Sequence, residues 1–428
     1  MTTKKTYLKL GIRLVSPLAI GSGKNASTDS DVILDSNFQP IITATSLAGT
    51  IRHFLKDTVN CDDQIWGTID GDNAVASRIR FYDGLPVSDS FVTIRDSVSI
   101  ENKIHDEAEP DEFLYNKVGV SGAKFDKEAI EADTDFTALI ELSDASDEEY
   151  YSIMLALSAI DSGLLRIGSK TTRGYGQLKI TYLKRAEFTL EKDREKWLGF
   201  DQYDLDSDNC YNDITGTLSD YSIDKYCDTI TLHLKQKGAL SIRSYTVKDV
   251  ASADYMQLSD SKGTPVIPGT SWAGVFRNRF KELSGSIELT DQLFGFVDKV
   301  TNNNKRSGIT FSESRISDCV PKLITRTSID RFSGGVKDSA LYSEKTCYYG
   351  ETVLEIRIMK NIENAEKCRV ILSAVICDLD RGYLSVGGLT SVGRGLFEVT
   401  KMYCNGNDVT NALKNGDILK MIGDENID

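Results

Sequence analysis

Hydrophobic and polar positions follow the same pattern twice along the chain. A strand-like segment (5–15, then 228–236) is followed by a polar loop and by a segment (45–57, then 270–283) in which apolar residues return at every fourth position. That spacing places the apolar residues on one face of a helix, so it predicts an amphipathic helix with one buried side. The residues that set the spacing are Leu47, Ile51 and Leu55 in the first segment and Trp272, Phe276 and Phe280 in the second.

Each pattern continues into the same series of further elements. A short strand, a long variable stretch, another strand, a second helix and a last strand follow in both halves. The helix predicted over 147–162 opens with Ser146 and Glu149, which have the spacing of a capping box. The resulting order, βαββαβ, is that of the ferredoxin-like fold and predicts an α+β protein. The strands are predicted over 77–83, 136–142 and 177–183 in the first half and over 307–313, 352–358 and 395–402 in the second, where 363–379 is the counterpart helix.

The two halves also share sequence. Residues 29–55 align with 254–280 without gaps, and four later blocks match in the same order. Self-similarity of this kind indicates a duplication, so we interpret the chain as two diverged copies of one unit. The matched positions include Asp29 and Asp254, Asp35 and Asp260, Pro40 and Pro265, Ser46 and Ser271, Gly49 and Gly274, Arg52 and Arg277, and Glu128 and Glu344.

The matching blocks predict how the chain is divided. We expect a first domain over 1–185 and a second over 228–403, joined by an acidic linker or insertion at 186–227. The C-terminal tail, 404–428, shows no clear periodicity.

Composition and charge limit the classes of function. The 428 residues carry a net charge of −14, which argues against a protein that coats nucleic acid with its whole surface but allows a local basic groove. No CxxC pair occurs among the 8 cysteines and there are only 3 histidines, so a tetrahedral zinc site is not expected. Neither a charged leader nor a long apolar run is found, and we expect a cytoplasmic protein.

One glycine-rich loop precedes the last strand in each copy. Glycine permits a positive φ and a close approach of another backbone, and both loops carry basic residues whose neighbouring amides suit an RNA backbone. A tight turn before the last strand explains the same sequence. The residues concerned are Gly168, Gly174 and Gly176 with Lys170 and Arg173 in the first loop, and Gly387, Gly393 and Gly395 with Arg394 in the second.

The predicted start of the first helix in each copy is rich in Ser and Thr. Ser46 and Ser271 lie there, and Arg52 and Arg277 follow on the same helices. Amides and hydroxyls at a helix N-terminus bind phosphate, which makes these four residues candidate RNA contacts. An ordinary N-cap with surface charges is an equally good interpretation.

Two pairs of matched aspartates allow different interpretations. Asp35 and Asp260 lie in turn sequences, where Asp bonds its own backbone. Asp29 and Asp254 each end a polar loop, where a carboxylate can position a metal ion or orient a 2′-hydroxyl for in-line attack. A histidine-based mechanism is not favoured, because His53 is matched by Asn278 in the second copy.

The segments PVIPGTSWAGVFRNRF, from residue 265, and RTSIDRFSGGVK, from residue 326, together with the glycine loops, resemble motifs of the RAMP superfamily of CRISPR proteins. They are most similar to the repeated backbone subunit of type III effector complexes, and a fused pair is similar to the type III-D group. The first copy departs from the pattern, because Thr43 and Ala44 stand where Pro and Gly are usual.

The resemblance implies two tandem RNA-recognition-type domains that stack along a CRISPR guide RNA. It implies a protruding thumb hairpin in each domain, within 84–135 and 314–351, which displaces one nucleotide of the guide–target duplex. It also implies that complementary target RNA is cut at that site by a metal-dependent centre, with Asp29 and Asp254 as the matching aspartates and Mg²⁺ as the expected ion. The partners implied are a large polymerase-like subunit, a small subunit and neighbouring backbone subunits.

Two alternatives remain open at this point. The same fold can serve as a scaffold that holds guide RNA with one or both aspartates inert. A guide-processing endonuclease of the same superfamily is less favoured, since such enzymes often use histidine and the copies share no paired histidine.

Overall fold

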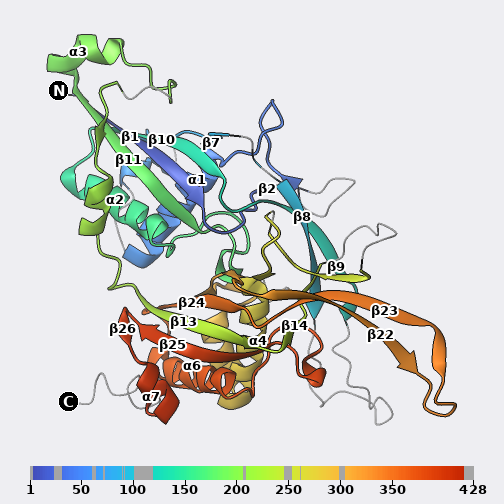
Figure 1. The fold of residues 1–428 in the computed structure, drawn as a ribbon. Helices are drawn as coiled ribbons and strands as arrows, with labels where there is room; N and C mark the ends of the chain where they lie inside the picture. Colours follow the sequence, from blue (N-terminus) through green and yellow to red (C-terminus); the bar gives the residue numbers. More distant parts are fainter. Residues whose placement is uncertain are drawn as a thin grey trace.

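The computed structural model describes residues 3–23, 31–59, 64–70, 73–88, 90, 92–100, 119–205, 209–244, 253–260, 262–297 and 304–418. Two α+β domains follow one another along the chain, the first in the upper half and the second in the lower half of Figure 1. In the part of the chain just given, no helix has the length and apolar character needed to cross a membrane.

The first domain is built on one antiparallel sheet. Its central strand β1 (Lys4–Leu14) pairs with β10 (Asp135–Ser143) on one side and with β11 (Leu178–Thr189) on the other. The short strand β6 (Ile79–Phe81) completes the order β11-β1-β10-β6, with β7 (Leu85–Pro86) also on β10. When these four strands are numbered 1 to 4 in chain order, their order across the sheet is 4-1-3-2. This is the order of the ferredoxin-like sheet that the sequence predicts.

The second domain repeats the sheet with the same order. Strand β13 (Cys227–Lys237) lies between β24 (Glu351–Met359) and β25 (Leu396–Cys404), and β20 (Ile309–Phe311) pairs with β24. The tail beyond the predicted second domain adds β26 (Asn407–Asp408) at the far edge and helix α7 (Thr410–Asn415). The prediction of two tandem βαββαβ domains is therefore confirmed.

Two helices cover one face of each sheet. Helix α1 (Ala44–Phe54) and helix α2 (Asp147–Asp161) do so in the first domain, and α4 (Gly269–Ser284) and α6 (Ala365–Asp380) in the second. The predicted capping box of α2 is present, since Ser146 N donates to Glu149 Oε2 at 2.8 Å and Glu149 N to Ser146 Oγ at 3.2 Å. The apolar faces predicted for the first helix of each domain are buried: Leu47, Ile51 and Leu55 in one, and Trp272, Phe276 and Phe280 in the other.

Several shorter elements complete the list. They are β2 (Gly21–Gly23), β3 (Asp31–Val32), β4 (Thr68–Asp70), β5 (Asn73–Val75), β12 (Asn212–Asp213), β14 (Ala239–Leu240), β15 (Arg243–Ser244), β16 (Tyr255–Gln257), β17 (Val266–Ile267), β18 (Phe296–Val297), β19 (Asn304–Lys305), β21 (Ser314–Arg315), α3 (Leu190–Leu198) and α5 (Ile287–Phe294), with one π-helical turn, η1 (Leu55–Val59), and the 3-10 turns η2 (Gln64–Trp66), η3 (Thr171–Arg173), η4 (Thr215–Asp220) and η5 (Thr390–Val392).

The segment predicted as a linker or insertion, 186–227, packs on both faces of the first sheet. Its aromatic residues, among them Trp197 and Phe200, lie against Tyr7 and Phe188 on the face opposite to α1 and α2. Farther along, Leu218 joins the main core on the helix side. Acidic residues thus lie on the solvent side of a segment whose apolar residues extend the first domain.

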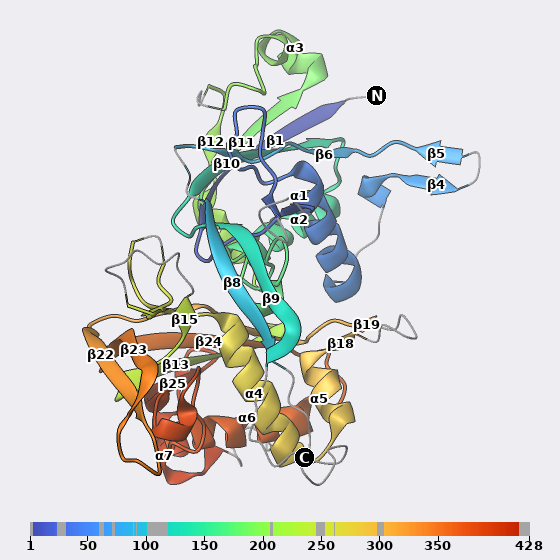
Figure 2. The same ribbon diagram turned by 90° about the vertical axis from the view of Figure 1, so that its right-hand side faces the viewer.

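A long hairpin projects from each domain, as predicted for the thumbs. Strands β8 (Val92–Ile100) and β9 (Gly119–Ile130) form the first, and β22 (Val320–Ile329) and β23 (Val336–Tyr348) the second. In Figure 1 the second hairpin extends sideways from the second domain, and in Figure 2 the first descends along that domain. The first hairpin therefore contributes to the contact between the domains.

The two domains meet through a very close backbone contact. The glycine loop of the first domain, at Arg173 and Gly174, lies against Gly269, the first residue of α4. A Cβ atom built on Gly269 would be 2.6 Å from the carbonyl carbon of Arg173, so no other residue fits this position without a shift. Beside it, the buried side chain of Arg166 donates from Nη1 to the carbonyl of Phe311 at 3.1 Å.

A buried cluster of charges stabilises the same joint. Arg95 on β8 is 5% exposed and donates to Glu131 Oε2 at 3.0 Å and to Glu313 Oε2 of the second domain at 2.8 Å. Burial acts to lower the pKa of Arg95, but the two carboxylates raise it above its ordinary value. Burial also raises the pKa of Glu313, with Arg95 opposing the shift. One guanidinium therefore compensates two carboxylates that have lost most of their hydration.

Replacing Arg95 with Ala is expected to destabilise the protein by about 3 to 5 kcal/mol, because it leaves two buried carboxylates without their partner. The free energy of unfolding from urea titration measures the effect. The matched control is Arg13→Ala, since Arg13 makes a two-pronged ion pair with Asp135 at the surface and is expected to cost under about 1 kcal/mol. Equal losses in the two variants would contradict the role given to Arg95.

Candidate functional site: aspartate, thumb and glycine loop

Asp254 lies exposed at the root of the second thumb. It comes just before β16, which runs parallel to β23 with Tyr255 opposite Glu344. The backbone N–H of Ser343 donates to Asp254 Oδ2 at 2.8 Å and the Ser343 hydroxyl to the same oxygen at 3.2 Å, while Asp254 N donates back to Ser343 Oγ at 3.2 Å. The carboxylate is thereby fixed on the thumb strand. No sequence pattern indicates a role for Ser343, although its neighbour Glu344 belongs to a matched block.

Of the other matched aspartates, the structure describes Asp35 and Asp260. Asp29 lies outside the described residues. Asp35 Oδ1 accepts the N–H groups of Asn37 and Gln39, both at 2.8 Å, and Asp260 Oδ1 likewise accepts two N–H groups of its own turn. The turn interpretation of Asp35 and Asp260 is therefore confirmed.

The tip of the second thumb is organised by Asp330. Its Oδ1 accepts N–H groups from Phe332 at 3.0 Å and Ser333 at 2.8 Å, and these bonds, the one from Ser333 first, lower the pKa of Asp330. The turn leaves the Phe332 ring 97% exposed. An aromatic ring held this far from the domain is suited to stacking on a base.

Arg394 does not lie where a phosphate-binding residue is expected. It is buried, 3% exposed, and its Nη1 pairs with Glu344, which also accepts from Ser241 Oγ at 2.8 Å. The guanidinium of Arg243 lies 4.0 Å from the ring centre of Tyr255 beside this group. Arg394 therefore ties the second glycine loop to β23, the strand that fixes Asp254.

The glycine loops have the tight geometry that the sequence allows. All six glycines, at 168, 174, 176, 387, 393 and 395, have φ between 72° and 96°. A Cβ atom on Gly168 would lie 2.6 Å from the carbonyl oxygen of Ala19, and one on Gly387 would lie 2.6 Å from that of Ser241. Each loop thus packs against the backbone of the segment that follows the first strand of its domain, β1 or β13. The turn interpretation is therefore sufficient to explain these glycines.

The glycine loop and helix start of the first domain line one shallow hollow of about 420 Å³. Ser46 and Thr45 contribute from α1, Gly168 and Ser169 from the loop, and Gly21 from β2. Two motifs predicted separately as RNA contacts therefore meet at one surface. Hydroxyls, exposed backbone and a helix N-terminus are groups that bind phosphate.

The other predicted contacts lie around these surfaces. Arg52 is exposed on α1, 5.9 Å from the ring centre of Trp66, and Arg173 is exposed in the first glycine loop. Lys170 is half-buried over the ring of Tyr175, at 5.7 Å. On α4, the N–H of Ser271 donates to Pro268 O, and Arg277 pairs with Asp291 at 2.9 Å.

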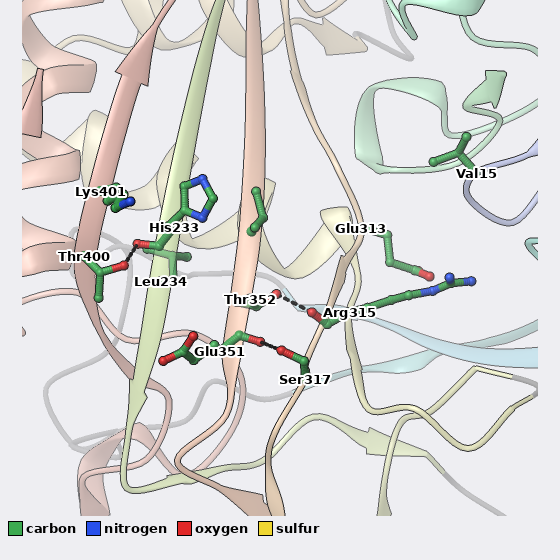
Figure 3. A pocket seen from close by; sticks show the side chains of 11 residues that line it. Val15, His233, Leu234, Glu313, Arg315, Ser317, Glu351, Thr352, Thr400 and Lys401 are labelled. Atoms are coloured by element: carbon green, nitrogen blue, oxygen red, sulfur yellow. Dashed lines mark hydrogen bonds between the residues drawn. The ribbon is translucent and has the colours of Figure 1, made fainter. Parts of the chain in front are cut away.

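A second hollow, of about 590 Å³, lies on the open face of the second sheet (Figure 3). It is lined by His233 of β13, Glu351 of β24, Lys401 of β25, and Glu313 and Arg315 beside the domain joint. Residues of the predicted site do not line it. Of the other histidines, His53 pairs with Asp57 at 3.0 Å on α1, and His105 lies outside the described residues.

The donor set at Asp254 has consequences for metal binding. Within the described ranges, no three His, Cys, Asp or Glu side chains gather closely enough to hold a metal ion. Mg²⁺ is commonly held by one or two carboxylates together with substrate phosphates. The exposed carboxylate of Asp254 fits such a site, in which the nucleic acid supplies the other charged oxygens.

Comparison with known protein families gives a match in each domain. Residues 12–179 and 246–398 each match the RAMP superfamily, so the matched regions cover most of both domains and far more than half of the chain. No curated protein is significantly similar to the chain.

Two glycines of the second loop, Gly393 and Gly395, allow a test of the close approach. Gly393→Ala is expected to cost about 1 to 2 kcal/mol, because its φ is 79° and no atom of the described residues lies within 4 Å of the new methyl. Gly395→Ala has a similar φ, but its methyl would overlap Val386 O, which adds a further ~1 to 3 kcal/mol. The free energy of unfolding of both variants, measured by urea titration, tests this difference. Equal losses in the two variants would refute the overlap with Val386 O as the cause.

Proposed function

The chain belongs to the RAMP superfamily, and on that premise we propose that it is a guide-RNA-binding backbone subunit of a type III CRISPR effector complex. The proposed activity is cleavage of complementary target RNA at two sites separated by one repeat, with one aspartate per domain. A chain of two fused units resembles the type III-D group. The other subunits of the complex would be its protein partners, and guide and target RNA its nucleic-acid partners.

The single observation that carries the proposal is the position of Asp254. A thumb that displaces a target nucleotide exposes the adjoining phosphate at its root, and the Asp254 carboxylate is fixed there on Ser343. The exposed Phe332 at the thumb tip and the exposed apolar residues along β22, such as Leu323, suit contact with bases rather than with water.

Asp254, with Asp29 in the first copy, would hold a divalent ion of the Mg²⁺ class. Bound there, the ion would favour the deprotonated 2′-hydroxyl and stabilise charge on the phosphate. The chain itself holds the thumb and the carboxylate in fixed relation. The β16–β23 pairing provides that relation before RNA binds.

A scaffold without cleavage is the second candidate, and one observation favours it. Ser343 already donates twice to Asp254 Oδ2, so the carboxylate has a structural role that does not require a metal ion. In that case the aspartate serves to fix the thumb strand and the target RNA is bound intact.

Cleavage by an assembled complex with guide RNA and Mg²⁺ tests the proposal. Asp254→Asn keeps an oxygen for Ser343 but removes the charge, so it should eliminate one product band while target binding is unchanged. Asp29→Asn should eliminate the other band, and EDTA both.

Ser343→Ala is the matched control, because it removes the hydroxyl bonds to Asp254 and keeps the carboxylate. It should retain both products. Uncut target with Ser343→Ala would indicate a structural role for the pair, and unaltered cutting by the Asp29→Asn/Asp254→Asn double variant would exclude the aspartates from catalysis.

Guide binding provides a separate test. Arg52→Glu places an acid on the exposed surface of α1, near the hollow, and should weaken RNA binding and reduce the slope of log K against log salt by about 1 or more. The matched control is Arg194→Glu on α3, an exposed position that lies away from the hollow and should bind as the wild type does. Equal binding by the two variants would argue against the hollow as an RNA surface.

A further inference from the structure

The contact between the two domains shows which residue a helix must have at its start to pack against a glycine loop. In the joint, the loop at Arg173 and Gly174 lies on the first residue of α4, Gly269. A methyl group on Gly269 would lie 2.6 Å from Arg173 C and 2.7 Å from both Arg173 O and Gly174 N. These are backbone atoms of a tight loop and cannot move aside cheaply, so the contact needs glycine at the helix start.

The corresponding helix start in the first domain has a side chain. Thr43 and Pro268 are the N-cap residues of α1 and α4, so Ala44 occupies the position of Gly269. With the joint's geometry, the Ala44 methyl would collide with the backbone of any incoming glycine loop.

The carboxylate beside the helix start also has different partners in the two domains. In the first domain Asp83 Oδ1 accepts the N–H of Ala44 at 2.6 Å, so the helix start is capped from within the domain. Two residues after β20, at the equivalent place, Glu313 instead turns to Arg95 of the preceding domain. The start of α1 is therefore closed sterically by Ala44 and is also capped by Asp83.

At the opposite end of the chain the second glycine loop is open. Gly393, the counterpart of Gly174, is exposed, and among the residues that the structure describes none would lie within 4 Å of a Cβ built on it. Val392 beside it is 59% exposed. On the thumb, Ile94 pairs with Glu128 and Ile324 with the matching Glu344, so exposed Thr325 is the counterpart of Arg95. The second domain thus presents a glycine loop like that of the internal joint, but it has Thr325 where the joint has the cation of Arg95.

We propose that the two ends of this chain cannot join to each other, and that the open glycine loop of the second domain docks a different protein subunit. The subunit that fits it presents a helix whose first residue is glycine, as α4 does to the first loop. The chain would then contribute one tandem pair to an assembly and would not polymerise. This inference concerns protein contacts alone and does not depend on RNA cleavage.

Sedimentation velocity of the RNA-free full chain over a range of concentrations tests the proposal, with the chain itself as the probe. Wild type should remain monomeric. Ala44→Gly/Thr325→Arg restores the glycine and the cation of the internal joint at the two ends, and should associate head to tail at least tenfold more tightly than wild type. Adding Gly393→Asn, which tolerates a positive φ but places a side chain in the contact, should abolish the association.

Thr325→Arg alone is the matched control, because it keeps the Ala44 methyl, and it should remain monomeric. Association of this control as tight as that of the double variant would refute the steric block. Head-to-tail oligomers of the wild type, or no gain in the double variant, would equally overturn the proposal. Circular dichroism of each variant establishes that the fold is retained.

Discussion

The contact on which the arrangement of the two domains depends is the buried guanidinium of Arg95. Three charged groups from β8, from the residue after β9 and from the second domain meet there with little access to water. Removing charge from water is costly, and the cost is offset only where the geometry satisfies every group. The first thumb is therefore joined to both domains at once by an ionic contact. The neighbouring Asp133 adds a half-exposed pair with Lys262 and Arg315 across the same joint.

The fold could be predicted from the sequence to a large degree, because the duplication supplies two independent instances of each element. The spacing of Leu47, Ile51 and Leu55 and that of their counterparts indicate the same buried helix face twice. The capping box at Ser146 and the turns at Asp35 and Asp260 are local hydrogen-bond patterns, which short sequence motifs specify well. Most helix and strand limits follow within a few residues, whereas β11 runs on to Thr189, beyond its predicted end at 183.

The site could be predicted less completely. Basic character alone pointed to Arg394, but its partner Glu344 is fifty positions away in the chain and makes the arginine a buried structural residue. The role of Ser343 depends on the parallel pairing of β16 with β23, a long-range contact that no local pattern encodes. The same holds for Arg95 and Glu313, which belong to different domains. The sequence of 186–227 predicts a linker or an insertion, but it does not predict where that segment packs. The contact of Trp197 with Tyr7 on the first sheet joins residues that are far apart in the chain.

The packing of that segment has a consequence for synthesis of the protein. The main core of the first domain includes Leu218, Ile223 and Cys227, the last of which is already the first residue of β13. A nascent chain released only as far as residue 185 would expose the surfaces that these residues cover. The first domain can therefore complete its core on the ribosome only when the opening strand of the second domain has emerged, which places the two copies in a fixed order of maturation despite their common fold.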